Sequence, residues 1–508
     1  MTTKWTSICL VALCLGGARA QSSYGLAAGN AARTAAYFES IRYDPVELGI
    51  FLREMPKGGD LHNHIDGAVY AESFLKWAAL DGLCVSKPDL AIVPAPCDAS
   101  KGQIPAAVGV QNDALYTQLV DALSMKDFVA GTESGHDHFF ATFAKFSPAS
   151  AMRAASMLAE VANRAGAENV SYLELMWSPG MFDAAALGEK AGWDGNPDDE
   201  RAKIGAELVP VVAQARQYFD NAEQGMRQLL GCGTPSALPG CRVTIRYQAQ
   251  VIRTLPTAGV FAEILYGYML ADIDPRVPAV NLVAPEDNQV ALDDYETHMR
   301  ILRAVHQWYP GVKLSLHAGE LTLGLVPPED LRFHIRDAVE VAGANRIGHG
   351  VDIMYEDNAP QLMVEMAQRH IMVEINLTSN DEILGVSGDA HPFQAYRAAG
   401  VPVALSTDDE GVSRIDLTHE FTRAVETYDL TYPDLKTLVR NSLEYAFLAG
   451  PSLWQSTAPF RPVAACAGVP LGTGVRSGPC HDFLVQSDHA RLQWLLEASF
   501  RRFEATQW

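Results

Sequence analysis

The sequence lacks several short motifs that identify common enzyme classes. It contains no phosphate-binding GxxxxGK[ST] loop, no HExxH helix and no GxSxG turn. These absences argue against P-loop nucleotide hydrolases, HExxH zinc proteases and serine hydrolases of the α/β type. Cysteines with the Cys-x-x-Cys spacing of zinc knuckles and redox sites are missing too, and we find no internal repeat.

Basic residues and long apolar runs are also scarce. Lys and Arg number 39 against 61 Asp and Glu, which gives a formal charge of −22. Such an acidic chain is not expected to bind a nucleic acid backbone or an anionic membrane surface. No apolar run reaches the length that a bilayer-spanning helix needs. A small neutral molecule remains a compatible ligand.

Residues 1–20 have the pattern of a secretory signal peptide. Lys4 provides the positive start, Ile8–Leu15 the apolar centre and Ala18-Arg19-Ala20 a small-x-small cleavage site. We therefore expect cleavage after Ala20 and a secreted or periplasmic protein, with periplasm and cell exterior left open.

Six cysteines remain after that cleavage, and an even number in an exported protein favours disulfides. Six cysteines allow about 15 connectivities, and the sequence does not decide among them rigorously. Their grouping favours three local pairs in Pro- and Gly-rich segments: Cys84–Cys97, Cys232–Cys241 and Cys466–Cys480.

Strand-like and helix-like segments alternate through most of the 508 residues. Eight strand candidates are Asp60–His64, Val170–Trp177, Arg242–Ile252, Ala279–Val283, Lys313–His317, Arg346–Gly350, His370–Asn376 and Val401–Thr407. Strands separated by helices indicate parallel βα units, and eight such units predict an α/β fold of the TIM-type (β/α)8 barrel class.

The barrel is expected to carry inserted loops and extra helices at both ends. After the signal, we divide the chain into a helical segment at 21–54, the barrel at 55–450 and a C-terminal loop and helix at 451–508. Cys84–Ala107 is predicted to be an inserted loop and Gly450–Pro479 is loop-rich. The amphipathic helix His481–Gln507 would pack on the barrel or on another subunit, and a homodimer stays open.

Histidines and acids fall at the carboxyl ends of the predicted strands, where such barrels carry their reacting groups. His62 and His64 end the first strand on one face, His317 ends the fifth, and Asp408 follows the eighth. Three imidazoles and a carboxylate suit one Zn²⁺ per chain with a position left for water. Zinc lowers the pKa of water and so supplies a hydroxide nucleophile.

Three further residues could take part in the reaction, and two of them also have a structural interpretation. Glu320, three residues beyond His317, is placed to act as a general acid or base. His349, which ends the sixth strand, could serve the site or cap its strand, and Asp409 could bind a substrate nitrogen or cap the next helix. A second His-x-His, His136 and His138, is predicted to be surface or capping.

At this point the chain resembles the adenosine deaminases of the amidohydrolase superfamily, especially the secreted adenosine deaminase-related proteins. The resemblance covers most of residues 45–450. It is carried by five motifs in the family's order: MPKGGDLHNHIDGA, YLELMWSP, SLHAGE, RIGHGV and LSTDD.

The resemblance implies a role for each matching residue. His62, His64, His317 and Asp408 would hold zinc. Glu320 would protonate the purine N1, His349 would orient the attacking hydroxide, Asp409 would bond N7, and Asp66 the ribose 5′-hydroxyl. Phe143 and Phe146 would form a hydrophobic lid, with core packing as the alternative.

Two positions depart from the family pattern. Ala284 stands where a glycine amide usually contacts ring N3, so a positive φ there would be costly. Glu410 stands where proline often follows the aspartate pair, and it would alter the pocket rim. The resemblance implies zinc-dependent deamination of adenosine or 2′-deoxyadenosine. The alternatives are a superfamily hydrolase acting on another purine, ring amine or amide, and a non-catalytic secreted nucleoside-binding protein.

Overall fold

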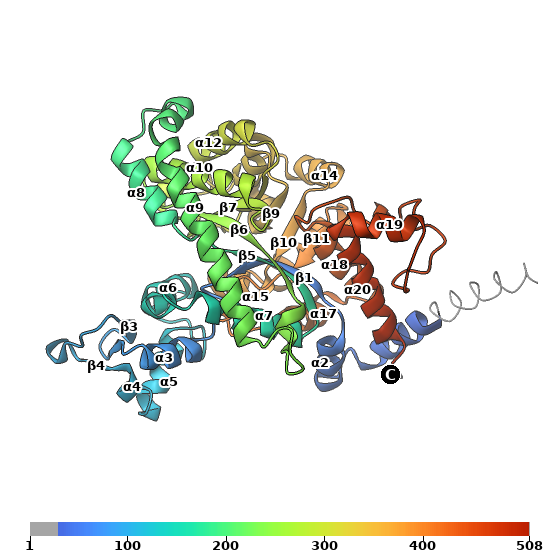
Figure 1. The fold of residues 1–508 in the computed structure, drawn as a ribbon, viewed down its shortest axis with the longest axis horizontal. Coiled ribbons are helices and arrows are strands. Elements are labelled where there is room, and N and C mark those ends of the chain that lie inside the picture. The colour runs from blue at the N-terminus through green and yellow to red at the C-terminus, as the bar shows by residue number, and fades with distance from the viewer. Residues whose placement is uncertain (1–28, 507–508) are drawn as a thin grey trace, which may run out of the picture.

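A computed structural model of the protein describes residues 29–506 and contains a single eight-stranded parallel barrel (Figure 1). Each strand pairs with the next one around the barrel. The strands are β1 (Gly58–His64), β5 (Val170–Met176), β6 (Thr244–Ile252), β7 (Ala279–Val283), β8 (Lys313–Ala318), β9 (Arg346–His349), β10 (Met372–Ile375) and β11 (Val403–Leu405). All eight predicted strands are confirmed, and so is the TIM-type (β/α)8 class.

The barrel closes between its last and first strands through a few contacts instead of a ladder. Asn63 and Asp408 form an isolated parallel bridge, and the amide of Asp408 donates to the carbonyl of His62 at 2.9 Å. Both β1 and β11 therefore end at the same edge, where the predicted site residues lie.

The strand sequences explain a barrel that is apolar outside and polar inside. Side chains alternate along a strand, so in β5 Leu173 and Leu175 face the opposite way from Glu174. Glu174 is fully buried and accepts hydrogen bonds from Arg346 of β9 and Gln248 of β6. The interior below the strand ends is thus a hydrogen-bonded polar network.

Helices follow the strands and surround the barrel. Before β5 come α2 (Pro45–Glu54), α3 (Ala71–Leu80), α4 (Ala106–Gly109), α5 (Asp113–Ala122), α6 (Gly135–Ser150) and α7 (Ala154–Ala167). Between β5 and β8 come α8 (Met181–Ala191), α9 (Pro197–Leu229), α10 (Thr257–Ile273), α11 (Gln289–Asp293) and α12 (Tyr295–Trp308). After β8 come α13 (His334–Asp337), α14 (Ala359–Arg369), α15 (Leu377–Leu384), α16 (Phe393–Ala398), α17 (Leu417–Tyr428) and α18 (Tyr432–Glu444).

The insertion after α3 contains a small sheet where a loop was predicted. Its strands are β2 (Cys84–Ser86), β3 (Ala91–Val93) and β4 (Gln103–Pro105), in the antiparallel order β3-β2-β4. Strands of three residues are too short to show the alternation that identifies strands in a sequence. In Figure 1 this part of the chain projects from the barrel at the lower left.

The C-terminal region also holds more structure than predicted. A hairpin of β12 (Trp454–Thr457) and β13 (Phe460–Pro462) precedes α19 (Pro479–Gln486) and α20 (Asp488–Glu504). The predicted single helix is divided at Ser487, whose side chain caps α20. α20 packs on the chain's own barrel, where Glu497 pairs with Arg440 and Phe503 contacts Phe51.

Three disulfides join the six cysteines of the described region in the predicted pairing. They are Cys84–Cys97, Cys232–Cys241 and Cys466–Cys480. Within residues 29–506, none of the helices combines the length and the apolar character that crossing a bilayer requires. The predicted signal peptide lies outside the described residues.

Candidate metal and substrate site

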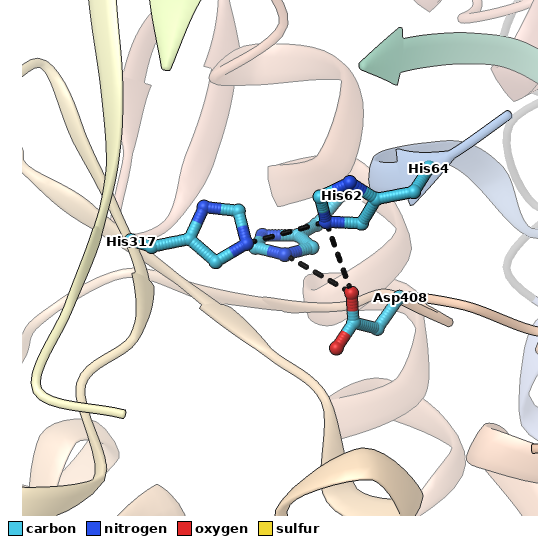
Figure 2. A group of neighbouring side chains, drawn as sticks. All are labelled: His62, His64, His317 and Asp408. Atoms are coloured by element: carbon cyan, nitrogen blue, oxygen red, sulfur yellow. Dashed lines mark hydrogen bonds and ion pairs between the residues drawn. The ribbon is translucent and has the colours of Figure 1, made fainter. Parts of the chain in front are cut away.

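Three histidines and one aspartate converge at the carboxyl ends of the strands. His62 and His64 come from β1, His317 from β8, and Asp408 follows β11. Figure 2 shows the three imidazoles and the carboxylate turned toward one another. One possible ligand atom from each lies within 4.8 Å of the others. His64 Nε2 is 3.2 Å from His317 Nε2 and 3.3 Å from Asp408 Oδ1.

Hydrogen bonds fix which ring nitrogen two of these histidines present. His62 Nδ1 lies 2.6 Å from Glu374 Oε2, and His317 Nδ1 lies 2.9 Å from Asn281 Oδ1. The Asn281 oxygen is identified by the backbone N–H of His317, which donates to it at 3.1 Å. Because both oxygens accept, each Nδ1 carries the proton and each Nε2 presents a lone pair to the shared space.

Two atoms of the cluster are buried without a hydrogen-bond partner, as expected of metal ligands. His62 Nε2 and Asp408 Oδ1 are buried and have no hydrogen-bond partner. Leaving such atoms unsatisfied is costly, and a cation between them would remove the cost. Three imidazole nitrogens and one carboxylate oxygen are ligands that Zn²⁺ takes. The cluster therefore fits a single zinc ion.

The backbone around the cluster is held in an uncommon conformation. Asp408 has φ of +58° and His349 has φ of +68°, although neither is glycine. Left-handed residues of this kind cost roughly 1 kcal/mol or more and persist where their surroundings fix them. Ser379 Oγ, for example, donates to Asp408 Oδ2 at 2.7 Å. Asp408 thus keeps Oδ1 directed at the histidines.

Glu320 and His349 are buried beside the cluster. Glu320 Oε1 lies 3.5 Å from His349 Nδ1, and His349 Nε2 lies 3.9 Å from Asp408 Oδ2. Burial, followed by the negative charge of Asp408, raises the pKa of Glu320 to about 8. A carboxyl group in such an environment can hold a proton near neutral pH and give it to a substrate.

Asp409 and Asp66 add two further carboxyl groups. Asp409 Oδ1 is buried without a partner, and burial, followed by the charge of Asp408, raises the pKa of Asp409 well above its usual range. Gly67 packs so closely that a Cβ there would lie 1.6 Å from Asp409 Oδ1, so a side chain at position 67 does not fit. Asp66 is partly exposed.

A cavity of about 370 Å³ opens onto this group of residues. It is lined by His64, Asp66, Phe139, Phe140, Phe143, Gln250, Ile252, Val283, Ala284, Pro285, His317, Glu320, Ile383, Asp408 and Asp409. A mostly apolar wall with a few polar groups is typical of small-molecule sites of this size. Among the described lining residues there is no Lys or Arg.

Of the four predicted substrate-contact residues, Asp66, Ala284 and Phe143 line the cavity and Phe146 does not. Ala284 adopts φ of +77°, which is costly for a residue other than glycine, and Arg253 Nε donates to its carbonyl at 2.9 Å. Phe143 lies in the wall. Phe146, one turn further along α6, is 1 % exposed and stacks on Phe74 of α3 at 4.6 Å. Phe146 therefore belongs to the core, and the lid interpretation does not apply to it.

The second His-x-His lies in the first turn of α6, away from the cluster. His136 Nε2 is 3.0 Å from Asp287 Oδ1, and His138 Nδ1 is 3.1 Å from Glu133 Oε2. In the described part of the chain neither joins a group of possible metal ligands. This agrees with the predicted surface or capping role.

Several residues of the site were not identified from the sequence. Gln250 and Ile252 end β6, so the strand-end rule that found the histidines could have found them. Glu374 is a charged residue within the apolar strand MVEI, which is a signal for a buried partner. Asn380 comes from a helix, and no sequence pattern indicated its place beside His349.

Comparison with known proteins agrees with this geometry. Residues 237–452 match the family model described as adenosine deaminase. A Clostridium perfringens adenosine deaminase is 34 % identical over 154 residues, which are 30 % of this chain and 42 % of that enzyme. Similarity to the adenosine deaminase family is thus shown for residues 237–452. The aligned segment spans less than half the length of the curated family members that it matches.

Solved structures share the fold of this chain over a longer stretch. The Arabidopsis N6-mAMP deaminase is 19 % identical, with a TM-score of 0.52 over 78 % of this chain and 95 % of that chain. Arabidopsis ADAL, solved with GMP, is also 19 % identical, with a TM-score of 0.53 over 78 % of this chain and 94 % of that chain. At this level of identity the likeness shows the fold.

Proposed function

We propose that the protein is an exported, zinc-dependent deaminase that converts adenosine and 2′-deoxyadenosine to inosine and 2′-deoxyinosine with release of ammonia. One observation carries the proposal: a buried acid, Glu320, lines the same mostly apolar cavity as three members of the four-residue zinc-type cluster. The similarity to the adenosine deaminase family favours hydrolytic deamination as the reaction.

The residues around the cavity fit a purine nucleoside. When bound, a zinc ion would lower the pKa of water and supply the nucleophile for attack on the purine C6. Glu320 would donate its proton to ring N1, which makes C6 electrophilic, and proton transfer to the amino group would let it leave as ammonia. Asp409, with its free Oδ1 in the cavity, would bond N7. N7 accepts hydrogen bonds, so Asp409 must carry the proton.

The remaining contacts would hold the base and the sugar. Phe139, Phe140 and Phe143 provide aromatic surface for the ring system. Asp66 would accept from the ribose 5′-hydroxyl. A 5′-phosphate at that position would meet the carboxylate of Asp66 without a Lys or Arg in the described lining to compensate. This supports nucleosides over nucleotides as substrates.

Ammonia release across a panel of purines tests the proposal. The zinc-loaded protein is expected to act on adenosine and 2′-deoxyadenosine, to lose activity in chelator, and to act weakly on AMP. Glu320→Gln should lower kcat by about 100-fold or more, as expected for a lost general acid. Glu329→Gln, an exposed change a few residues away, is the matched control. The proposed function would be refuted if the zinc-loaded protein turned over none of adenosine, deoxyadenosine and adenine.

Export is part of the proposal. Three disulfides support an oxidising compartment. N-terminal sequencing of protein recovered outside the cytoplasm should begin near Gln21.

A further inference from the structure

A chain of hydrogen bonds leads from a backbone amide to His349. The N–H of Phe393, the first residue of α16, donates to His391 Nδ1 at 3.2 Å. His391 Nε2 lies 3.0 Å from Asn380 Oδ1, and Asn380 Nδ2 lies 2.8 Å from His349 Nδ1. His349, Asn380 and His391 are all buried, at 3 % exposure or less.

The direction of the chain fixes where each proton lies. A backbone N–H is always a donor, so His391 Nδ1 must accept and His391 Nε2 must carry the ring proton. That proton points at Asn380, which therefore presents its oxygen to His391 and its NH₂ to His349. His349 Nδ1 then accepts, and its proton lies on Nε2. Reversing any link would bring two hydrogens face to face.

The same reasoning gives the opposite tautomer for two of the proposed ligands. His62 and His317 each donate from Nδ1 to an oxygen and present a bare Nε2. His349 presents an N–H at Nε2 and cannot coordinate through that atom. Its Nε2 is buried without a partner, 3.9 Å from Asp408 Oδ2.

We propose that Asn380 and His391 are positioning residues that hold His349 in the Nε2–H tautomer. His349 is thereby kept out of the metal's coordination sphere and offers a hydrogen-bond donor beside the cluster. Its effect on turnover rests on the proposed function, whereas the tautomer does not.

Two further neighbours of His349 Nδ1 bear on this assignment, one for it and one against it. Asn376 Nδ2 lies 3.4 Å away and also donates to it. Glu320 Oε1, at 3.5 Å, is the competitor, because a carboxylate there would favour a proton on Nδ1. Asn380 is 0.7 Å closer, as the 2.8 and 3.5 Å distances show, and its orientation is fixed from the far side.

The helix that carries Asn380 is itself firmly placed. Glu420 accepts from the amides of Leu377 and Thr378, the first residues of α15. The next two residues of that turn are Ser379, which bonds Asp408, and Asn380. The first turn of α15 therefore orients the expected ligand Asp408 and fixes the tautomer of His349. Burial lowers the pKa of His391 to about 4, so His391 is neutral at physiological pH.

Two substitutions at His391 separate positioning from packing. His391→Leu removes the donor to Asn380, so the amide can turn and His349 can take either tautomer. His391→Gln keeps an N–H for Asn380 Oδ1 and should preserve the arrangement. Neither change touches the cavity, since His391 does not line it. Thermal melting shows that each variant is folded.

The tautomer is measured by ¹⁵N NMR of labelled histidines in the zinc-loaded full chain without substrate, with His349 assigned from a His349→Gln sample. Wild type and His391→Gln should show a proton on Nε2, and His391→Leu a mixture. For adenosine, His391→Leu should lower kcat by about 10- to 100-fold with little change in KM, and His391→Gln should recover most of it.

A proton on Nδ1 in the wild type would overturn the tautomer assignment, and an unchanged tautomer in His391→Leu would overturn the claim that His391 holds it. Equal kcat losses in the two folded variants would overturn the positioning role. Absence of deamination in every protein would contradict the proposed function and leave the NMR test standing.

Discussion

Glu374 is the residue whose substitution tests the metal site most sharply. Its carboxylate accepts from His62 Nδ1, Ser315 Oγ and Arg346 Nε, each at 2.6 Å. Burial alone would raise the pKa of Glu374, but Arg346 and the two other donors outweigh burial and lower it from 4.5 to about 2. A lowering of roughly two units stabilises the charged form by about 3 kcal/mol.

Glu374→Gln should therefore cost both stability and metal affinity. A neutral amide cannot accept from all three donors, and its NH₂ would face one of them. The free energy of unfolding of the metal-free protein should fall by about 3 kcal/mol, as expected when one partner of a buried ion pair is removed. Zinc affinity should fall about 10- to 100-fold because His62 loses the group that fixes its tautomer.

Glu174→Gln is the matched control. Glu174 is equally buried and also pairs with Arg346, at 2.5 Å, but it bonds none of the proposed ligands directly. Its nearest connections run through Gln248 and Asn281 to His317 and through Arg346 and Glu374 to His62. Urea unfolding in chelator should show a similar loss for both variants. Zinc titration against a chromogenic chelator should show a large loss for Glu374→Gln alone. Unchanged zinc affinity in a folded Glu374→Gln protein would refute the reasoning.

Three further predictions concern the surroundings of the site. Ala284→Gly should raise the free energy of unfolding by roughly 1 kcal/mol, measured in urea, because glycine adopts φ of +77° without strain. Burial lowers the pKa of His136, but its bonds to Asp287 and Asp137 outweigh burial and raise the pKa to about 9. The destabilisation by Asp287→Asn should therefore be largest below pH 6.5 and disappear as the pH rises through about 9. Replacing Cys84 and Cys97 by alanine should destabilise the insertion by about 3 kcal/mol, detected as faster hydrogen exchange there.

The sequence predicted the barrel and the proposed ligands for one physical reason. Parallel strands bring their carboxyl ends to one edge, so His62, His317 and Asp408 could be placed together from strand positions alone. From the sequence, a positive φ at Ala284 could be recognised as costly but not predicted; the structure shows that Ala284 adopts it, with its carbonyl accepting from Arg253.

What the sequence could not predict depends on distant contacts. Glu374 meets His62 from 312 positions away, and Asn380 meets His349 from an adjoining helix. No local sequence pattern encodes such pairs. The sequence therefore could not predict the tautomers that distinguish the proposed ligands His62 and His317 from the hydrogen-bond donor His349. The sheet β2–β4 was missed because its three-residue strands are held together by each other and by the Cys84–Cys97 bond.

The proposed ligands lie across the weakest join of the barrel. β11 and β1 share one isolated bridge, and His62 and His64 stand on one side of it with Asp408 on the other. A zinc ion held by these three side chains would link the first strand to the last. Its binding free energy would then add to barrel closure, as it does wherever a metal joins distant segments.

Glu410 contributes a contact between the ends of β11 and β1 that does not involve a metal ion. Its carboxylate is buried, does not line the cavity, and accepts from Arg164 at 3.0 Å. Arg164 also donates to the carbonyl of Ala68, in the loop that follows β1. The pair therefore ties the loop after β11 to the loop after β1. A proline at position 410 could not accept the hydrogen bond from Arg164. Glu410, which replaces the proline of the family pattern, therefore stabilises the two loops beside the site. It does not form the rim of the pocket.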